Sequence, residues 1–115
     1  MNTYFGLSTP PGRSATATVR ISGESSKKVI ETLTVGKLKN LKHKTSSVTS
    51  IYNKNNTLID NVVVSFFKRP NSYTGEDLIE IHTHGNPVIV DHLCDNLLKL
   101  GLRLAEPGEF TLAAY

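Results

Sequence analysis

The sequence has little cysteine, no tryptophan and no long apolar run. One cysteine, Cys94, among 115 residues excludes an internal disulfide and any multi-cysteine zinc or iron–sulfur site. A single thiol also fits a reducing compartment. No stretch approaches 18 consecutive apolar residues, and the first residues lack the basic and apolar regions of a signal peptide. We therefore expect a cytoplasmic protein that makes no membrane contact.

Charge of either sign is modest. The 13 Lys and Arg residues and 10 Asp and Glu residues give a net charge of +3. This balance permits contact with RNA or with an anionic ligand but requires neither. A content of 38% apolar and 20% charged residues excludes a coiled coil, a collagen-like repeat and a disordered tail. The length predicts one domain, spanning residues 1–115, with its own hydrophobic core.

Two segments alternate as half-buried strands do. Over 15–22, Ala, Val and Ile share one face while Thr, Arg and Ser share the other. Over 77–84, one face carries Ile79, Ile81 and Thr83, and the other carries Leu78, Glu80, His82 and His84. Further strands are predicted over 4–8, 45–53, 58–67 and 102–105. The prolines and glycine within 9–14 predict a loop, and residues 53–56 predict a hairpin turn.

Two helices complete the predicted fold. Ser25 or Ser26 is a candidate cap for a helix over 26–34 with Val29, Ile30 and Leu33 inward. Pro87 suits the first turn of a helix over 87–100, where Val90, Leu93, Leu97 and Leu100 form the core stripe and Gly101 follows the end. Residues 109–115 begin a further helical segment.

The resulting order, β-β-α-β-β-β-α-β, indicates an α+β fold with a mostly antiparallel sheet and two helices. The strand segment 62–67 is apolar on both faces, so we expect cover on both sides.

Arg20 and Glu80 are the candidate ligand-binding residues. Each lies on the polar face of an alternating strand. A carboxylate presents two acceptor oxygens that suit adjacent N–H donors of a pterin or purine, and an arginine fork suits a carboxylate or phosphate. Together they can hold an anionic heterocycle. The alternative is that both are solvated residues on an open sheet face.

The other reactive side chains are weaker candidates. His82 and His84 point the same way, as two metal ligands can, but Asp60, Asp91 and His92 are only guesses for a third ligand, so no metal site is predicted. Cys94 is interpreted as a partly buried small hydrophobe rather than a nucleophile. No nucleophile-elbow or phosphate-loop motif is present, and no catalytic residue is assigned.

Three segments in register resemble one family. They are LSTPPGRS with VRISG (7–14 and 19–23), NSYTGED with EIHTHG (71–77 and 80–85), and AEPGEFT (105–111). Together they resemble the N-terminal domain of the MnmE (TrmE) family of tRNA modification GTPases, over essentially the whole chain.

The resemblance implies a fold and a function. It implies a domain that binds tetrahydrofolate, as the 5-formyl or 5,10-methylene form, and drives homodimerisation. Its fold is similar to the folate domain of the glycine-cleavage T-protein group, in which two such halves share one chain. With the flavoprotein MnmG, the family installs a (carboxymethyl)aminomethyl group at C5 of the wobble uridine of tRNA, and folate supplies the one-carbon unit.

Other parts of the family pattern have no counterpart in this sequence. The helical and GTPase domains, which use GTP, magnesium and potassium, are absent, so this chain alone should not hydrolyse GTP. The family's folate-contacting arginine matches Arg20 and its pterin-contacting glutamate matches Glu80, but a third contact, a lysine, would fall beyond Tyr115. Asn86 replaces a family glycine, and the segment 112–115 departs from the usual basic residue followed by Ala-Phe.

These departures support an alternative hypothesis. In it, the chain is a dimerisation or tRNA-contacting module without a working folate site. The basic run over 37–44 is either a solvated connection or the tRNA contact of such a module.

Overall fold

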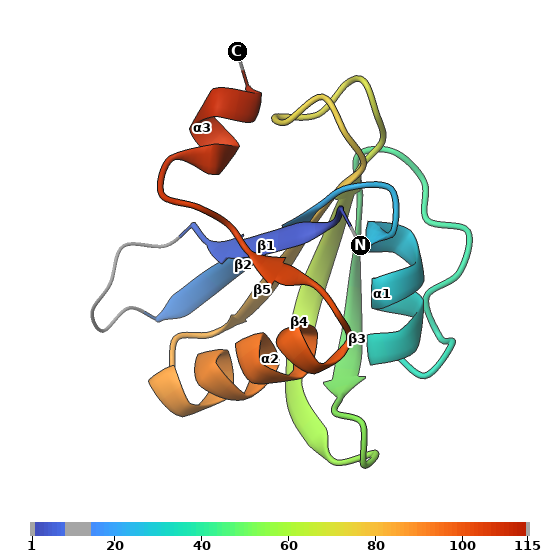
Figure 1. Cartoon of the computed structure of the whole chain (residues 1–115). Helices are drawn as coiled ribbons and strands as arrows, with labels where there is room; N and C mark the ends of the chain where they lie inside the picture. Colours follow the sequence, from blue (N-terminus) through green and yellow to red (C-terminus); the bar gives the residue numbers. More distant parts are fainter. Residues whose placement is uncertain (1, 9–14, 115) are drawn as a thin grey trace.

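The computed structural model describes residues 2–8 and 15–114 (Figure 1). Its elements are β1 (Tyr4–Leu7), β2 (Thr16–Ser22), α1 (Ser26–Leu33), β3 (Thr45–Tyr52), β4 (Leu58–Phe67), β5 (Leu78–His84), α2 (Pro87–Lys99), β6 (Arg103–Leu104) and α3 (Glu109–Ala113). The predicted α+β order is confirmed, and the helical segment after residue 108 forms α3 as a third, short helix. The loop predicted over 9–14 lies outside the described residues.

The strands form one mixed sheet in the order β3-β4-β5-β2-β1-β6. Every pairing is antiparallel except that of β1 with β6. In the β2–β5 pair, the register runs without a break from Thr16 opposite His84 to Ser22 opposite Leu78, and it sets Arg20 opposite Glu80. The two predicted alternating strands are therefore direct neighbours.

The core lies on one face of the sheet. Both alternating strands turn their isoleucines to this face, where α1 and α2 cover them (Figure 1). Its fully buried members include Val19, Ile21, Ile30, Leu33, Ile51, Val64, Ile79, Ile81, Leu93 and Leu97. Because burying each such side chain contributes about 1.5–3 kcal/mol, this one layer supplies most of the hydrophobic stabilisation.

The opposite face of the sheet is here called the open face. At β1 and β2 it is covered by α3, whose Phe110 packs near Gly6 and Tyr4, whereas over β3, β4 and β5 it carries no helix among the described residues. Arg20, Glu80 and His82 lie on it, together with Val48, which is 83% exposed, and Val63, which is 37% exposed. The expectation that both faces of β4 are covered therefore holds within this chain only for the helix face.

At their N-terminal ends, α2 follows the simple capping rule and α1 does not. Ser25 occupies the N-cap position of α1, but its side chain makes no capping bond, and the buried Ser26 hydroxyl instead donates to the Gly23 carbonyl at 2.7 Å. At α2, the Asn86 side chain accepts a hydrogen bond from the Val88 N–H at 2.9 Å. Asn86 therefore caps the helix that Pro87 begins.

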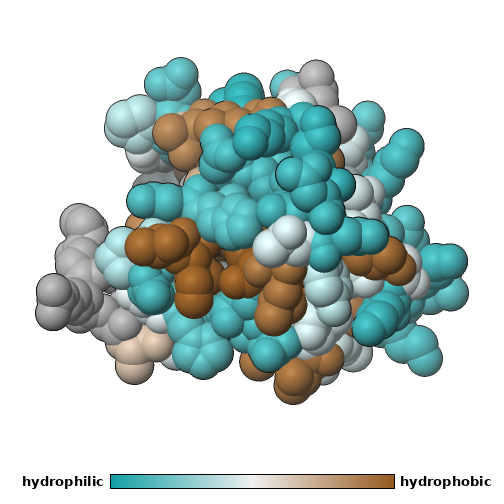
Figure 2. Space-filling model, turned by 90° about the horizontal axis from the view of Figure 1, so that it is seen from below, coloured by the Kyte–Doolittle hydropathy of each residue, from teal (hydrophilic) through white to brown (hydrophobic). Residues whose placement is uncertain are grey.

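No helix in the described ranges is long and apolar enough to cross a membrane. Figure 2 views the underside, where α2 lies, and shows brown apolar groups interspersed with teal polar ones. Val88 and Leu98 of α2 are among the exposed apolar residues.

The core layer gives a direct stability prediction. Ile81→Ala should lower the free energy of unfolding by about 2–5 kcal/mol, because Ile81 is fully buried and its removal leaves a cavity. Urea denaturation measures the change. Val88→Ala, at an exposed position of α2, is the control and should change the value by less than about 0.5 kcal/mol. Equal losses in the two variants would contradict the assignment of Ile81 to the core.

Candidate functional site

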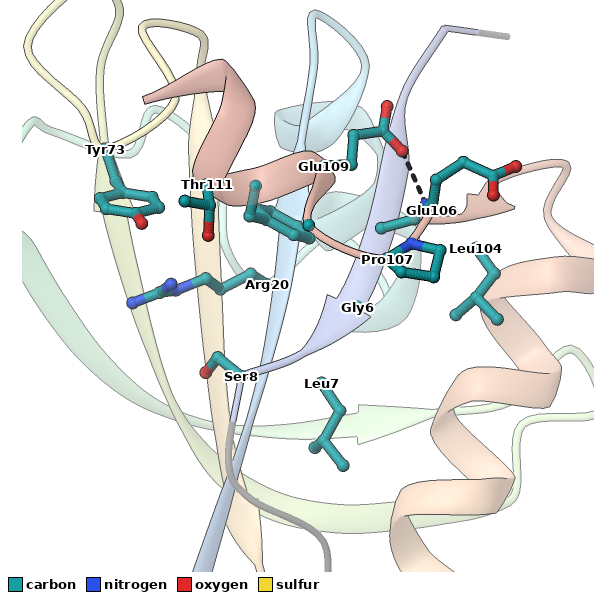
Figure 3. A pocket seen from close by; sticks show the side chains of 13 residues that line it. Gly6, Leu7, Ser8, Arg20, Tyr73, Leu104, Glu106, Pro107, Glu109 and Thr111 are labelled. Atoms are coloured by element: carbon teal, nitrogen blue, oxygen red, sulfur yellow. Dashed lines mark hydrogen bonds between the residues drawn. The ribbon is translucent and has the colours of Figure 1, made fainter. Parts of the chain in front are cut away.

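A cavity of about 410 Å³ lies between the β2-β1-β6 end of the sheet and the chain around α3 (Figure 3). Figure 3 shows Arg20, Tyr73 and Thr111 on one side of it and Leu104 and Pro107 on the other. Its lining residues are Gly6, Leu7, Ser8, Arg20, Tyr73 and residues 104–111. The volume lies within the range of about 300–1,000 Å³ that is usual for small-molecule sites.

Arg20 is the charged residue of the cavity on the sheet side. Its Nε donates a hydrogen bond to Glu80 Oε2 at 2.9 Å, and its guanidinium carbon lies 5.0 Å from the centre of the Tyr73 ring. The guanidinium is therefore fixed between a carboxylate and an aromatic face, an arrangement that orients its remaining N–H groups. Glu80 does not line the cavity itself but supports Arg20 from the neighbouring strand.

A polar network continues from Glu80 across the open face. His82 Nε2 lies 3.7 Å from Glu80 Oε1, and His82 Nδ1 lies 3.0 Å from Thr18 Oγ1. Ser65 Oγ is 3.5 Å from His82 Nε2, which extends the network onto β4. Because Glu80 is only 17% exposed, these contacts compensate for the partial burial of its charge.

The far wall of the cavity is α3, which side chains of β1 and β6 hold in place. Arg103 forms a two-point ion pair with Glu109, with 2.7 Å between Nη1 and Oε1. The Arg103 guanidinium also lies 4.9 Å from the centre of the Tyr4 ring, and the rings of Tyr4 and Phe110 are 5.0 Å apart. A Cβ at Gly6 would come within 3.0 Å of Phe110, so glycine allows this close approach.

These contacts shift the titration of the groups that hold α3. The hydrogen bond from Arg103 lowers the pKa of Glu109 to about 2 and raises that of Arg103. Burial raises the pKa of Tyr4. The anionic form of Glu109 is thus the one that holds the helix.

The candidate metal ligands do not meet at one point in the structure, although two of them, His84 and Asp60, are in contact. His84 Nδ1 lies 2.9 Å from Asp60 Oδ1, whereas His82 faces Thr18 and Glu80, and His92 Nε2 lies 3.0 Å from the Asn53 amide. No three His, Cys, Asp or Glu residues gather as a metal site in residues 2–8 and 15–114. Cys94 is partly buried, as interpreted from the sequence, and burial raises its pKa to about 11.

The structure brings the two predicted site residues together, but it adds others. The sequence had offered no reason to join Arg20 to Glu80 directly, and it missed Tyr73 and the wall over 104–111. Each missed residue lies in a loop or a short element, where no periodicity marks a side chain as facing a site. The only available signal was the presence of Tyr73 and 105–111 in the family-like segments.

The chain is similar to known proteins over almost its whole length. The family described as "GTP-binding protein TrmE N-terminus" matches residues 3–115. A tRNA modification GTPase MnmE from Nitrosomonas eutropha is 44% identical over 114 residues, which cover 99% of this chain and 25% of that protein. The MnmE proteins of Thermotoga sp. strain RQ2 and Legionella pneumophila strain Corby are 42% and 40% identical over 115 residues. The chain therefore spans about a quarter of the length of these relatives.

The Arg103–Glu109 ion pair predicts that the attachment of α3, the far wall of the cavity, weakens in acid. The low pKa of Glu109 means that its stabilising contribution is present above the ordinary value of 4.5 and is lost as the pH falls through about 2. An NMR titration of the Glu109 carboxyl carbon should show this low midpoint, and Arg103→Gln should move it upward. Lys99→Gln, which removes the Asp95 ion pair on α2, is the control and should leave the midpoint unchanged.

Proposed function

Because the chain belongs to the TrmE N-terminal family, as the match over residues 3–115 shows, we propose that it binds tetrahydrofolate and forms a homodimer. The proposed parent is a tRNA modification GTPase. The observation that carries the folate assignment is the Arg20–Glu80 pair beside a cavity of about 410 Å³.

The residues present fit a reduced folate. In this proposal, the pterin lies on the open face next to the cavity. There the Glu80 carboxylate accepts hydrogen bonds from adjacent N–H groups of the pterin, because each of its oxygens can accept a bond beside the one that Oε2 takes from Arg20. The remaining N–H groups of Arg20 complement the negative charge of the ligand and orient its one-carbon end. Tyr73 supplies an aromatic wall beside Arg20. When bound, the folate supplies the one-carbon unit, and these side chains position it.

The open face supports the homodimer part of the proposal. Val48 and Val63 are exposed on neighbouring strands, directly beside the network that contains Glu80 and His82. A second copy of the chain packed on this face would bury both valines and would also remove water from the polar network. In the duplicated folate domains that the family resembles, the second half plays this part.

The activity of the whole protein extends the proposal beyond this chain. We propose that in the cytoplasm the parent hydrolyses GTP with magnesium and potassium and acts with the flavoprotein MnmG. Their joint product would be the (carboxymethyl)aminomethyl group at C5 of the wobble uridine of tRNA. This chain contributes ligand positioning and dimer contacts to that reaction.

Calorimetric titration with 5-formyltetrahydrofolate tests the ligand site. Glu80→Ala should weaken binding about ten- to hundredfold, because a charge-assisted hydrogen bond contributes about 1.5–3 kcal/mol. Arg20→Gln should weaken it similarly, and exposed Glu24→Gln is the matched control. Unchanged affinity in Glu80→Ala would remove the pterin assignment.

Sedimentation of the same samples tests the dimer. Val48→Asp with Val63→Asp should shift a dimer toward monomer at micromolar concentration, because two carboxylates would be buried without partners. Val88→Asp on α2 is the control for an added surface charge. A dimer that binds no folate would favour the alternative, a dimerisation module without a working folate site.

A further inference from the structure

Most of the lysines of the chain lie together on one side of the molecule, away from the cavity. The seven residues, here called the lysine face, are Lys27, Lys28, Lys37, Lys39, Lys42, Lys44 and Lys68. All seven are exposed. The other two lysines, Lys54 and Lys99, lie near one another at the hairpin end of β3–β4 and on α2. The charge of +3 is therefore distributed unevenly.

Three contacts join the parts of the lysine face. The Lys27 ammonium lies 5.4 Å from the centre of the Phe66 ring, which connects α1 to the end of β4. The Lys44 N–H donates to the Phe66 carbonyl at 2.8 Å, and the Lys68 N–H donates to His43 Nδ1 at 2.9 Å. Figure 1 shows α1 and the connection that follows it along the same side of the molecule.

The connection over 37–44 is held in a defined conformation. Leu38 and Leu41 pack against the core, while the lysines between and beside them point to solvent. The Thr34 hydroxyl accepts from the Leu38 N–H at 3.2 Å, and the Thr45 N–H donates to the Lys42 carbonyl at 3.2 Å. The ammonium groups are therefore presented by an anchored segment, which lowers the ordering cost of binding an anionic surface.

The lysine face makes no ion pair with the carboxylates of the described residues. The ion pairs there involve Arg20, Lys99, Arg103, His82 and His84. Glu31 is the acidic side chain within α1. Arg69 follows Lys68 but lies beside Glu24, Glu76 and Asp77, so it is not counted with the lysine face. The seven ammonium groups are thus available to an external anion.

From these observations we infer that the lysine face docks the phosphate backbone of tRNA. Lysine is depleted from protein–protein interfaces, whose centres need apolar or aromatic anchors, and the exposed large apolar side chain in this region is Val35. Spread ammonium groups instead suit sequence-independent contact with phosphates. The choice of tRNA as the RNA rests on the proposed function.

Fluorescence anisotropy with labelled unmodified tRNA, measured over a series of salt concentrations, tests this inference on the purified chain. Substituting Lys37, Lys39, Lys42 and Lys44 with Gln should weaken binding about tenfold or more. It should also reduce the slope of log affinity against log salt by about three, because each lost phosphate contact contributes ~0.7–0.9. The same four residues changed to Arg should retain binding.

Two comparisons make the test decisive. Lys54→Gln with Lys99→Gln removes charge from the other end of the molecule and should leave both affinity and slope nearly unchanged. Poly-glutamate at equal charge concentration should compete poorly with tRNA. Absence of tRNA binding by the unaltered chain, equal losses in the control, or equal competition by poly-glutamate would overturn the inference.

Folate titration of the same variants separates this inference from the proposed function. Normal folate binding in every variant, with tRNA binding that ignores the lysines, overturns only the lysine-face inference. Lysine-dependent tRNA binding without any folate binding supports the lysine face and contradicts the folate site. Thermal unfolding by circular dichroism should be similar in all variants, since the substituted side chains are exposed.

Discussion

The pairing of β2 with β5 is the constraint on which the rest of the structure depends. Its unbroken register sets Arg20 opposite Glu80 and, on the other side of the sheet, Ile21 opposite Ile79. A slip of one residue would send the isoleucines to the open face and the charged pair into the core. The free energy of burying the apolar side chains therefore also fixes the geometry of the candidate site. The Arg20–Glu80 pair is not needed to set the register of β2 against β5, because burial of the core side chains already selects that register.

The two ends of the sheet form different surfaces, because the helices cover them to different extents. The β1–β6 edge carries the cavity, whose second wall is α3, whereas the β3–β4 end presents valines on the open face. The lysine face lies apart from both, on α1 and the connection to β3. RNA would therefore occupy a part of the domain that is separate from the open face, which ligand and second copy would share, so RNA need not displace either of them.

The sequence predicted the parts of this arrangement that depend on local periodicity. Alternation over 15–22 and 77–84 identified both central strands and placed Arg20 and Glu80 on their polar faces. Helical spacing likewise identified Leu93 and Leu97 as buried. Sequence alone could not join Arg20 to Glu80, because that contact spans 60 residues and depends on which strands are neighbours. It also missed Tyr73 and the role of α3 as a cavity wall, because a loop and a five-residue helix leave no periodic pattern that shows which side chains face a site.

The attachment of α3 has a consequence for affinity. This helix has no buried residue of its own, so a few side chains, chiefly Arg103 with Glu109 and Phe110 with Tyr4, determine the fraction of molecules in which it is docked. An apparent dissociation constant equals the intrinsic constant divided by that fraction. Any change that detaches α3 would therefore weaken the apparent affinity for the ligand without altering a ligand contact. Conversely, a ligand bound in the cavity would slow amide hydrogen exchange across α3, so the short helix reports occupancy.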